Sequence, residues 1–236
     1  HSYGSVTMPH EVSALLDALL AGVRDALGDN LVGFYLRGSL ALGDFDPENS
    51  DVDILVVTER PVSEAEFGAL AALHARIPPA EENEYGRRYE VSYIDRVSIK
   101  RFAPGERRHP RCADDAPFGW AEHRPNWVLE RWTVRERGVT LLGPDPKTLV
   151  DPIAPAEIRE AVRDELRERL QHWTDGTWPR EEMLHRGAQV FEIETVCRAL
   201  FTLANGGLPT KPQAVAWGQD MLPERWRALI EWAQAF

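Results

Sequence analysis

The fold is decided by Arg37-Gly38-Ser39-Leu40, followed by Gly43 and then by Ser50-Asp51-Val52-Asp53-Ile54-Leu55-Val56-Val57. A Gly-Ser turn follows the apolar run 31–36, and two carboxylates on alternate residues open a second apolar run. Because residues i and i+2 of a strand point to the same face, Asp51 and Asp53 converge while the residue between them packs the other way. The stretch therefore predicts two strands with a pair of carboxylates at the start of the second.

Two carboxylates this close repel each other unless a cation lies between them. Mg2+ prefers carboxylate oxygens and leaves positions free for water and substrate phosphates, so we expect Asp51 and Asp53 to bind two Mg2+ ions together with a nucleoside triphosphate. The turn at Gly38 and Ser39 offers backbone donors and a hydroxyl to the phosphate oxygens. Taken alone, the Asp-x-Asp pair also fits an ordinary hairpin with a solvated acidic loop.

From Phe34 to Val57 the sequence resembles the signature of the nucleotidyltransferase superfamily that shares the DNA polymerase beta fold. The resemblance implies transfer of a nucleoside monophosphate to an acceptor hydroxyl, with release of pyrophosphate. It also calls for a third carboxylate on a later strand, and Glu90 in the alternating run 89–95 answers it as a catalytic and metal-binding residue. Read without the family, Glu90 also fits a charge placed on an edge strand.

Downstream, the runs 196–203, 206–211 and 214–217 are similar to the C-terminal domain of aminoglycoside adenylyltransferases. The most similar type modifies the 3''-hydroxyl of streptomycin or the 9-hydroxyl of spectinomycin. The resemblance implies ATP as co-substrate, with Arg198 and Lys211 at its phosphates. Arg198 lies on a largely apolar helix, where a charge needs an anionic partner. Glu194, four residues earlier, is the alternative partner.

The residues that we expect to contact the acceptor match the family pattern less well. The resemblance places a tryptophan after a Phe-Gly pair, which makes Trp120 a substrate contact, although tryptophan is often a core residue. Where the family carries acidic residues and a histidine ahead of the arginine, this chain has Ala188 and Phe191. Glu182 and His185 keep an acid-x-x-His spacing six residues out of register, and we expect them to line the acceptor site.

Composition limits the partners. The formal net charge of -11 argues against a nucleic-acid partner and suits a cationic small-molecule acceptor, although it also fits solubility alone. No apolar run is long enough for a membrane span, which predicts a soluble protein. The two cysteines, Cys112 and Cys197, are expected to be reduced thiols of a cytoplasmic protein. The pattern does not indicate an oligomeric state.

The expected fold class is an α/β nucleotidyltransferase domain with a mixed sheet and helices, followed by an all-α helical bundle. We expect residues 1–8 to be a tag remnant, residues 9–150 to form the first domain and residues 151–236 the second. Residues 103–117, rich in Pro, Arg and Asp, are predicted as a long loop, and the segment from Trp120 to Trp132 as helical. Two other functions stay open, namely modification of a partner protein, as in toxin-antitoxin nucleotidyltransferases, and non-catalytic nucleotide binding.

Overall fold

The computed structural model describes residues 7–77, 82–103, 108–113, 116–177 and 184–235. The chain divides into two compact units between Pro152 and Ile153. The first contains a mixed sheet with helices and the second is helical, which confirms the predicted fold class. No helix in these ranges is both long enough and apolar enough to cross a membrane.

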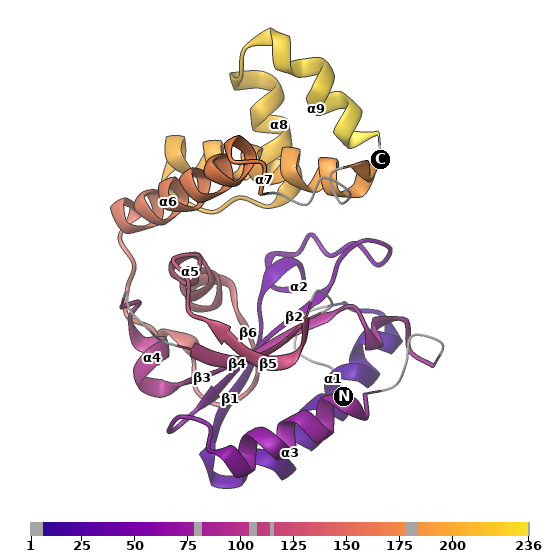
Figure 1. Cartoon of the computed structure of the whole chain (residues 1–236), viewed down its shortest axis with the longest axis vertical. Coiled ribbons are helices and arrows are strands. Elements are labelled where there is room, and N and C mark those ends of the chain that lie inside the picture. The colour runs from indigo at the N-terminus through magenta and orange to yellow at the C-terminus, as the bar shows by residue number, and fades with distance from the viewer. Residues whose placement is uncertain (1–6, 78–81, 104–107, 114–115, 178–183, 236) are drawn as a thin grey trace. The chain divides into compact units, whose positions relative to one another are not determined.

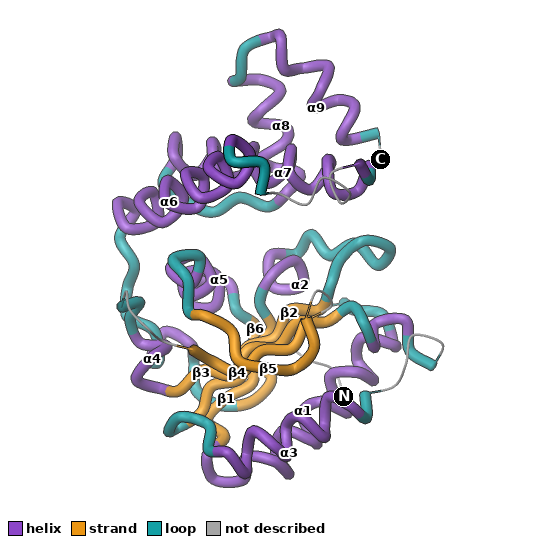
Figure 2. The backbone as a smooth tube through the Cα atoms, viewed as in Figure 1, coloured by secondary structure: helices purple, strands orange, loops and turns teal. Residues whose placement is uncertain are grey.

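Six strands form one sheet in the first unit, shown in orange in Figure 2. Their order across the sheet is β5-β4-β3-β2-β1-β6, and β2 and β3 are parallel while the other neighbours are antiparallel. The strands are β1 (Leu31–Leu36), β2 (Val52–Thr58), β3 (Tyr89–Asp95), β4 (Arg108–Ala113), β5 (Ala116–Glu122) and β6 (Val139–Leu142). The strands at Leu31–Leu36 and around Glu90 lie where the sequence predicts them.

The longer helices of this unit cover the two faces of the sheet. The helices are α1 (His10–Leu27), α2 (Gly38–Leu42), α3 (Glu64–Ala75), α4 (Arg96–Lys100) and α5 (Trp127–Arg137). Helices α1 and α3 lie along one face and α5 lies on the other (Figure 1). The predicted apolar stripe of α1 is confirmed, because all seven of its residues are buried: Val12, Leu15, Leu16, Leu19, Leu20, Val23 and Leu27. They pack against Phe34, Leu36, Ile54 and Val56 of the central strands.

Two sequence predictions are wrong in this unit. Instead of one long loop, residues 108–113 and 116–122 form β4 and β5, which pair from Arg108↔Glu122 to Ala113↔Ala116. Pro110 and the charged residues hide this hairpin in the sequence. The proline is tolerated because it lies beyond the two positions at which β4 pairs with β3. Trp120 accordingly lies in a strand, and the helix begins only at Trp127.

The second unit consists of α6 (Pro155–Thr174), α7 (Arg186–Asn205), α8 (Lys211–Met221) and α9 (Arg227–Gln234), together with a short turn of helix before α9. Its small core joins Cys197 of α7 to Ala214 and Val215 of α8 and to Ile230 of α9. Thr210 caps α8, since its side chain accepts a hydrogen bond from the backbone N–H of Gln213, and Pro212 follows in the first turn. This cap fixes Lys211 at the start of α8.

Candidate active site

The predicted carboxylates meet on the face of the sheet that α1 leaves uncovered. Asp53 of β2 and Glu90 of β3 are direct neighbours in the parallel register. The backbone N–H of Arg37, just after β1, donates to the carbonyl of Asp53 at 3.0 Å, so Arg37 continues the same register. Because the apolar residues on either side of Asp53 and Glu90 pack against α1, these three polar side chains project from the opposite face.

Gly38 is required where β1 turns into α2. Its φ of 64° lies in the left-handed region. A Cβ atom there would lie 2.0 Å from Oδ2 of Asp53, so any side chain would displace this carboxylate. Ser39 follows in the first turn of α2, beside the turn at which we expect the phosphates. The Gly-Ser pair thus lets the backbone approach Asp53 closely.

Two arginines hold the carboxylate of Glu90. Its Oε1 accepts from Nη2 of Arg37, and its Oε2 accepts from Nη2 of Arg111 at 3.0 Å. Arg37 also donates through Nη1 to Oε2 of Glu130, at 2.6 Å. Burial alone would raise the pKa of Glu90, but the arginine charges and hydrogen bonds outweigh it and lower the pKa to about 2. Glu90 is therefore ionised and fixed in orientation.

Asp53 is in the opposite situation. Burial raises its pKa to about 7, against the charge of Arg37 and with the help of nearby carboxylates. No side chain in the described ranges donates a hydrogen bond to its carboxylate. Asp53 is half-buried, and a partly desolvated carboxylate without a bonded counter-charge is the environment into which a cation fits. Asp51, in contrast, has an exposed side chain, with its Oδ1 3.8 Å from Nε of Arg88.

These residues fit Mg2+ through the Asp51 and Asp53 carboxylates, because this ion commonly takes one or two carboxylates and completes its shell with water and phosphate oxygens. Across the ranges that the structure describes, no group of three or more His, Cys, Asp or Glu side chains is arranged to hold a metal ion. Both oxygens of Glu90 are bonded to arginines. Participation of Glu90 in metal binding stays a prediction.

Arg198 and Lys211 lie in the second unit, on α7 and at the start of α8. The Nε atom of Arg198 is buried, with no hydrogen-bond partner in the described part of the chain. Glu194, the alternative partner of Arg198, forms its ion pair with Lys211, with Nζ and Oε2 3.2 Å apart. Lys211 therefore lies at the carboxylate of Glu194. Contact of Arg198 and Lys211 with nucleotide phosphates stays a prediction.

Of the predicted acceptor contacts, Trp120 lies in the same unit as the carboxylates but not beside them, and contact of His185 with an acceptor stays a prediction. Trp120 stacks on Phe67 of α3, with ring centroids 5.2 Å apart, and α3 lies on the other face of the sheet from Glu90. His185 precedes α7 in the second unit and is exposed. Glu182 lies outside the described residues.

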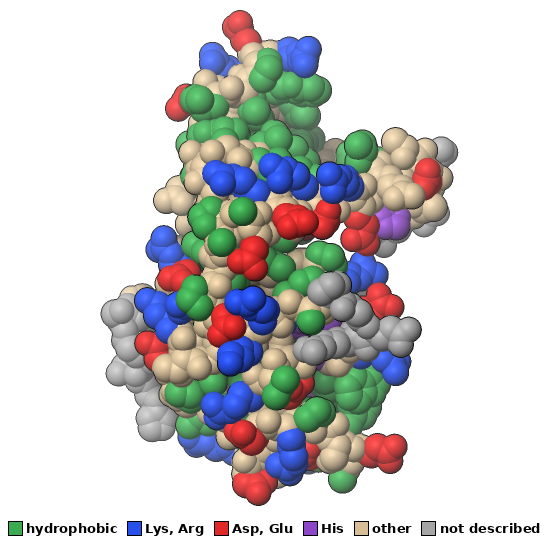
Figure 3. Space-filling view, turned by 90° about the vertical axis from the view of Figure 1, so that its left-hand side faces the viewer, with side chains coloured by type: hydrophobic (Ala, Val, Ile, Leu, Met, Phe, Trp, Pro, Cys, Tyr) green, Lys and Arg blue, Asp and Glu red, His purple; other side chains and the backbone are tan. Residues whose placement is uncertain are grey.

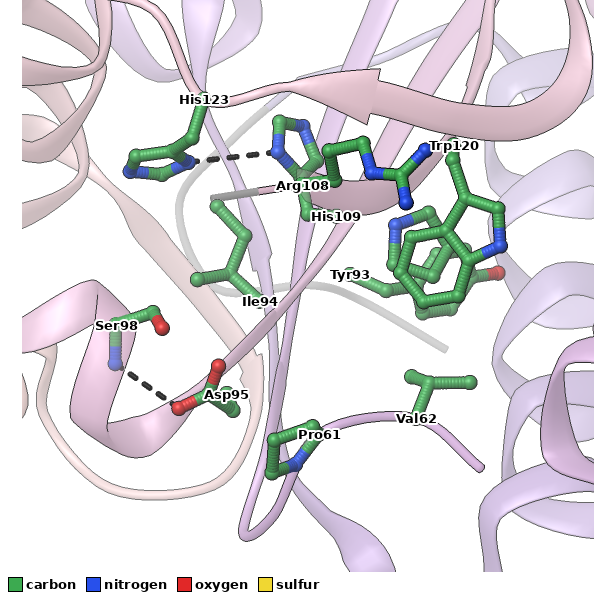
Figure 4. A pocket seen from close by; sticks show the side chains of 11 residues that line it. Pro61, Val62, Tyr93, Ile94, Asp95, Ser98, Arg108, His109, Trp120 and His123 are labelled. Carbon is green, nitrogen blue, oxygen red and sulfur yellow. Dashed lines mark hydrogen bonds between the residues drawn. The ribbon is translucent and has the colours of Figure 1, made fainter. Parts of the chain in front are cut away.

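One pocket of the first unit lies at the far ends of β2 and β3 from Asp53 and Glu90 (Figure 4). Trp120, His109 and His123 are among its lining residues. The Nδ1 atoms of the two histidines are 3.4 Å apart, and Nε2 of His123 lies 2.7 Å from Nη2 of Arg131. Because arginine only donates, it fixes the tautomer of His123 with the proton on Nδ1, directed at His109.

Sequence reasoning missed Arg37, Arg111 and Glu130. The only available signal was the position of Arg37 in the motif itself, at the register position facing Asp53. Arg111 lies in the segment that was predicted as a loop, and Glu130 lies 40 residues beyond Glu90 on a helix of mixed charge. When a strand is not predicted, the side chains that it places in the site are not predicted either.

Two families match different parts of the chain. Residues 17–109 match the nucleotidyltransferase domain, and residues 148–236 match the family described as "Aminoglycoside adenylyltransferase, C-terminal domain". The first match contains the Gly-Ser turn and all three carboxylates, and the second contains Arg198 and Lys211. The two halves of the predicted site therefore fall into two matched families.

Similar whole proteins carry names of one kind. A spectinomycin 9-adenylyltransferase of Campylobacter jejuni is 25% identical, over 95% of this chain and 82% of its own length. An aminoglycoside (3'') (9) adenylyltransferase of Escherichia coli is 26% identical, over 93% of this chain and 82% of its own length. The crystal structure of a spectinomycin adenyltransferase from Enterococcus faecialis, with ATP and spectinomycin, superimposes with a TM-score of 0.74 at 17% identity, covering 95% of this chain and 89% of that one. This likeness concerns the fold.

Proposed function

Because the chain belongs to the aminoglycoside adenylyltransferase-like enzymes of the nucleotidyltransferase superfamily, we propose that it transfers AMP from ATP to a hydroxyl of an aminoglycoside-type acceptor. Pyrophosphate is the second product. The observation that carries the proposal is the pairing of Asp53 with Glu90 on adjacent parallel strands, beside a glycine turn that leaves room for nothing larger. The named relatives support the same class of acceptor.

Asp51 and Asp53 take part in binding the nucleotide. Asp51 and Asp53 would hold Mg2+, in two ions as the superfamily pattern implies, and Gly38 with Ser39 would bind the triphosphate. When bound, Mg2+ would neutralise phosphate charge and stabilise the charge that develops during transfer. Arg198 and Lys211 add positive charge toward the phosphates, as the family resemblance implies. Positioning and electrostatics then supply most of the catalysis.

Glu90 acts on the acceptor. Its ionised carboxylate accepts a hydrogen bond from the acceptor hydroxyl and receives the proton as that oxygen attacks the α-phosphorus. The new P–O bond forms as the bond to pyrophosphate breaks, and the proton passes from Glu90 to solvent. The low pKa of Glu90, about 2, makes it a weak base, so orientation of the hydroxyl is its larger contribution.

The acceptor is tested by measuring pyrophosphate release from ATP with Mg2+ across streptomycin, spectinomycin, other aminoglycosides and lincosamides. We expect turnover with at least one aminocyclitol antibiotic. Asp53→Asn should abolish it, because the cation loses a half-buried carboxylate to which no side chain in the described ranges donates a hydrogen bond. Turnover retained by Asp53→Asn contradicts the proposed site. Transfer to a partner protein, with no response to any antibiotic, assigns the chain to the protein-modifying class instead.

A further inference from the structure

Arg37 joins the active-site sheet to α5. Its guanidinium lies between Glu90 of β3 and Glu130 of α5, with one Nη atom donating to each carboxylate. Only 4% of the Arg37 side chain is exposed, and Trp127 of α5 lies beneath it, 5.7 Å from guanidinium carbon to ring centroid. A planar fork bonded to two carboxylates has little freedom to turn. The position of Arg37 therefore depends on both acids.

Glu130 is delivered by a firmly held helix. The next residue, Arg131, is 1% exposed and donates to the carbonyls of Ile99 at 3.0 Å and of Ser98 in α4. Arg131 also bonds the carbonyl of Trp127 at 3.0 Å and His123 at 2.7 Å, and His123 continues to His109 (Figure 4). These contacts tie the first turns of α5 to α4 and to the ends of β4 and β5. Glu130 thus offers Arg37 a fixed point outside the sheet.

The charges around Asp53 explain why the contact between Arg37 and Glu130 matters for the active site. Arg37 interacts electrostatically with Glu130, Glu90 and Asp53, but its hydrogen bonds go to the first two. If Glu130 were absent, the Nη1 donor would be left without its carboxylate in a buried place. Asp53 is the third carboxylate whose charge acts on Arg37, so the guanidinium would turn toward it, and Asp53 would then be paired with an arginine instead of a cation. Glu90 would lose its orientation in the same movement.

We propose that Glu130 is a positioning residue for nucleotidyl transfer, which acts through Arg37 to hold Glu90 in place and to keep Arg37 away from Asp53. The proposal rests on the proposed function for its effect on turnover. Its effect on the cation site does not depend on which acceptor is used. Loss of such outer partners of a metal or catalytic side chain typically costs about 10- to 100-fold in affinity or activity.

The test is a double-mutant cycle of Glu130→Gln and Arg37→Lys. Glutamine keeps the shape of Glu130 and removes its charge. Lysine keeps the charge of Arg37 but has one nitrogen in place of the two that Arg37 directs at separate carboxylates. We expect Glu130→Gln to lower kcat about 10- to 100-fold at saturating ATP and Mg2+, with KM for ATP changed less than about threefold. The double variant should be no slower than Arg37→Lys alone, because both changes break one path.

A second readout is independent of turnover. Mn2+ binding to the nucleotide-free protein, followed by electron paramagnetic resonance, should weaken about 10-fold or more in Glu130→Gln and no further in the double variant. Glu136→Gln, which removes another paired carboxylate of α5, is the matched control and should leave kcat and Mn2+ affinity unchanged. Glu130→Asp, which keeps the charge but shortens the side chain, should recover part of both and serves if Glu130→Gln does not fold.

The outcomes distinguish failure of the positioning role of Glu130 from failure of the proposed function. Effects of Glu130→Gln and Arg37→Lys that multiply in the double variant, or a Glu130→Gln protein with unchanged kcat and Mn2+ affinity, overturn the positioning role. A wild-type protein that transfers AMP to no acceptor overturns the proposed function, and the Mn2+ cycle then still decides the role of Glu130.

Discussion

Asp53 carries a carboxylate whose pKa is raised from 3.8 to about 7, chiefly by burial, with Arg37 acting in the opposite direction. Because the folded protein holds this proton more tightly than the unfolded chain, the free energy of unfolding falls as the pH rises from about 4 to 7. The cost comes from an ionised group without a bonded partner, which is what a cation-binding residue requires before its ion arrives. At this residue, binding capacity and stability of the metal-free protein oppose each other.

Asp53→Asn should therefore stabilise the metal-free protein while removing its activity. We expect the free energy of unfolding to rise by about 1–4 kcal/mol at pH 8, and by about 2 kcal/mol less at pH 5, where the wild-type carboxylate is largely protonated. Chemical denaturation in EDTA at the two pH values measures this difference. Excess Mg2+ should narrow the gap by stabilising the wild type alone. An equal gain at both pH values would show that the carboxylate is not strained.

At the scale of elements, α3 is attached to β3 through His74. Its Nδ1 and Nε2 atoms lie 2.8 Å from the hydroxyls of Tyr89 and Tyr93, and burial lowers its pKa from 6.5 to about 4. Since the folded state binds this proton less readily than the unfolded chain, the free energy of unfolding falls as the pH drops from about 6.5 to 4. Burial also lowers the pKa of His109 to about 4, with the same sign.

His74→Gln should reduce the acid sensitivity of the protein without removing it. We expect the loss of unfolding free energy between pH 7 and 4.5 to shrink by about 1–3 kcal/mol, and His109 supplies part of what remains. Denaturation curves across this range give the comparison, and His172→Gln on the exposed side of α6 is the control. If the His74→Gln protein keeps the full pH dependence, the histidine is not held neutral between the two tyrosines.

Some elements of the fold follow from the local sequence, and others depend on contacts with distant residues. The stripe of α1, the strand at Leu31–Leu36 and the turn at Gly38 follow from periodicity and from backbone demands within a few residues. The β4–β5 hairpin was missed because Pro110 and the charged residues around it contradict a strand pattern locally, and pairing of β4 with both β3 and β5 compensates. The bond between Arg37 and Glu130 joins residues 93 positions apart, so no local pattern carries it.

At the scale of the whole molecule, the formal net charge is -11. On the side drawn in Figure 3, acidic and basic side chains are interspersed rather than gathered into fields of one sign. A net charge of this kind acts at long range on any charged ligand. Such a charge would attract a cationic acceptor during its approach and repel ATP.

Ionic strength should therefore affect the two substrates in opposite ways. Between about 20 and 300 mM KCl, where the Debye length falls from about 20 to 6 Å, we expect kcat/KM for a dicationic acceptor to fall about 5- to 10-fold. The value for ATP, measured at saturating acceptor and Mg2+, should stay level or rise. An N-acylated, neutral derivative of the same acceptor is the matched control, because it keeps the reacting hydroxyl and removes the charge. If salt slows the neutral and cationic acceptors equally, it acts on the chemical step or on the fold, and the acidity of the chain plays no part in acceptor capture.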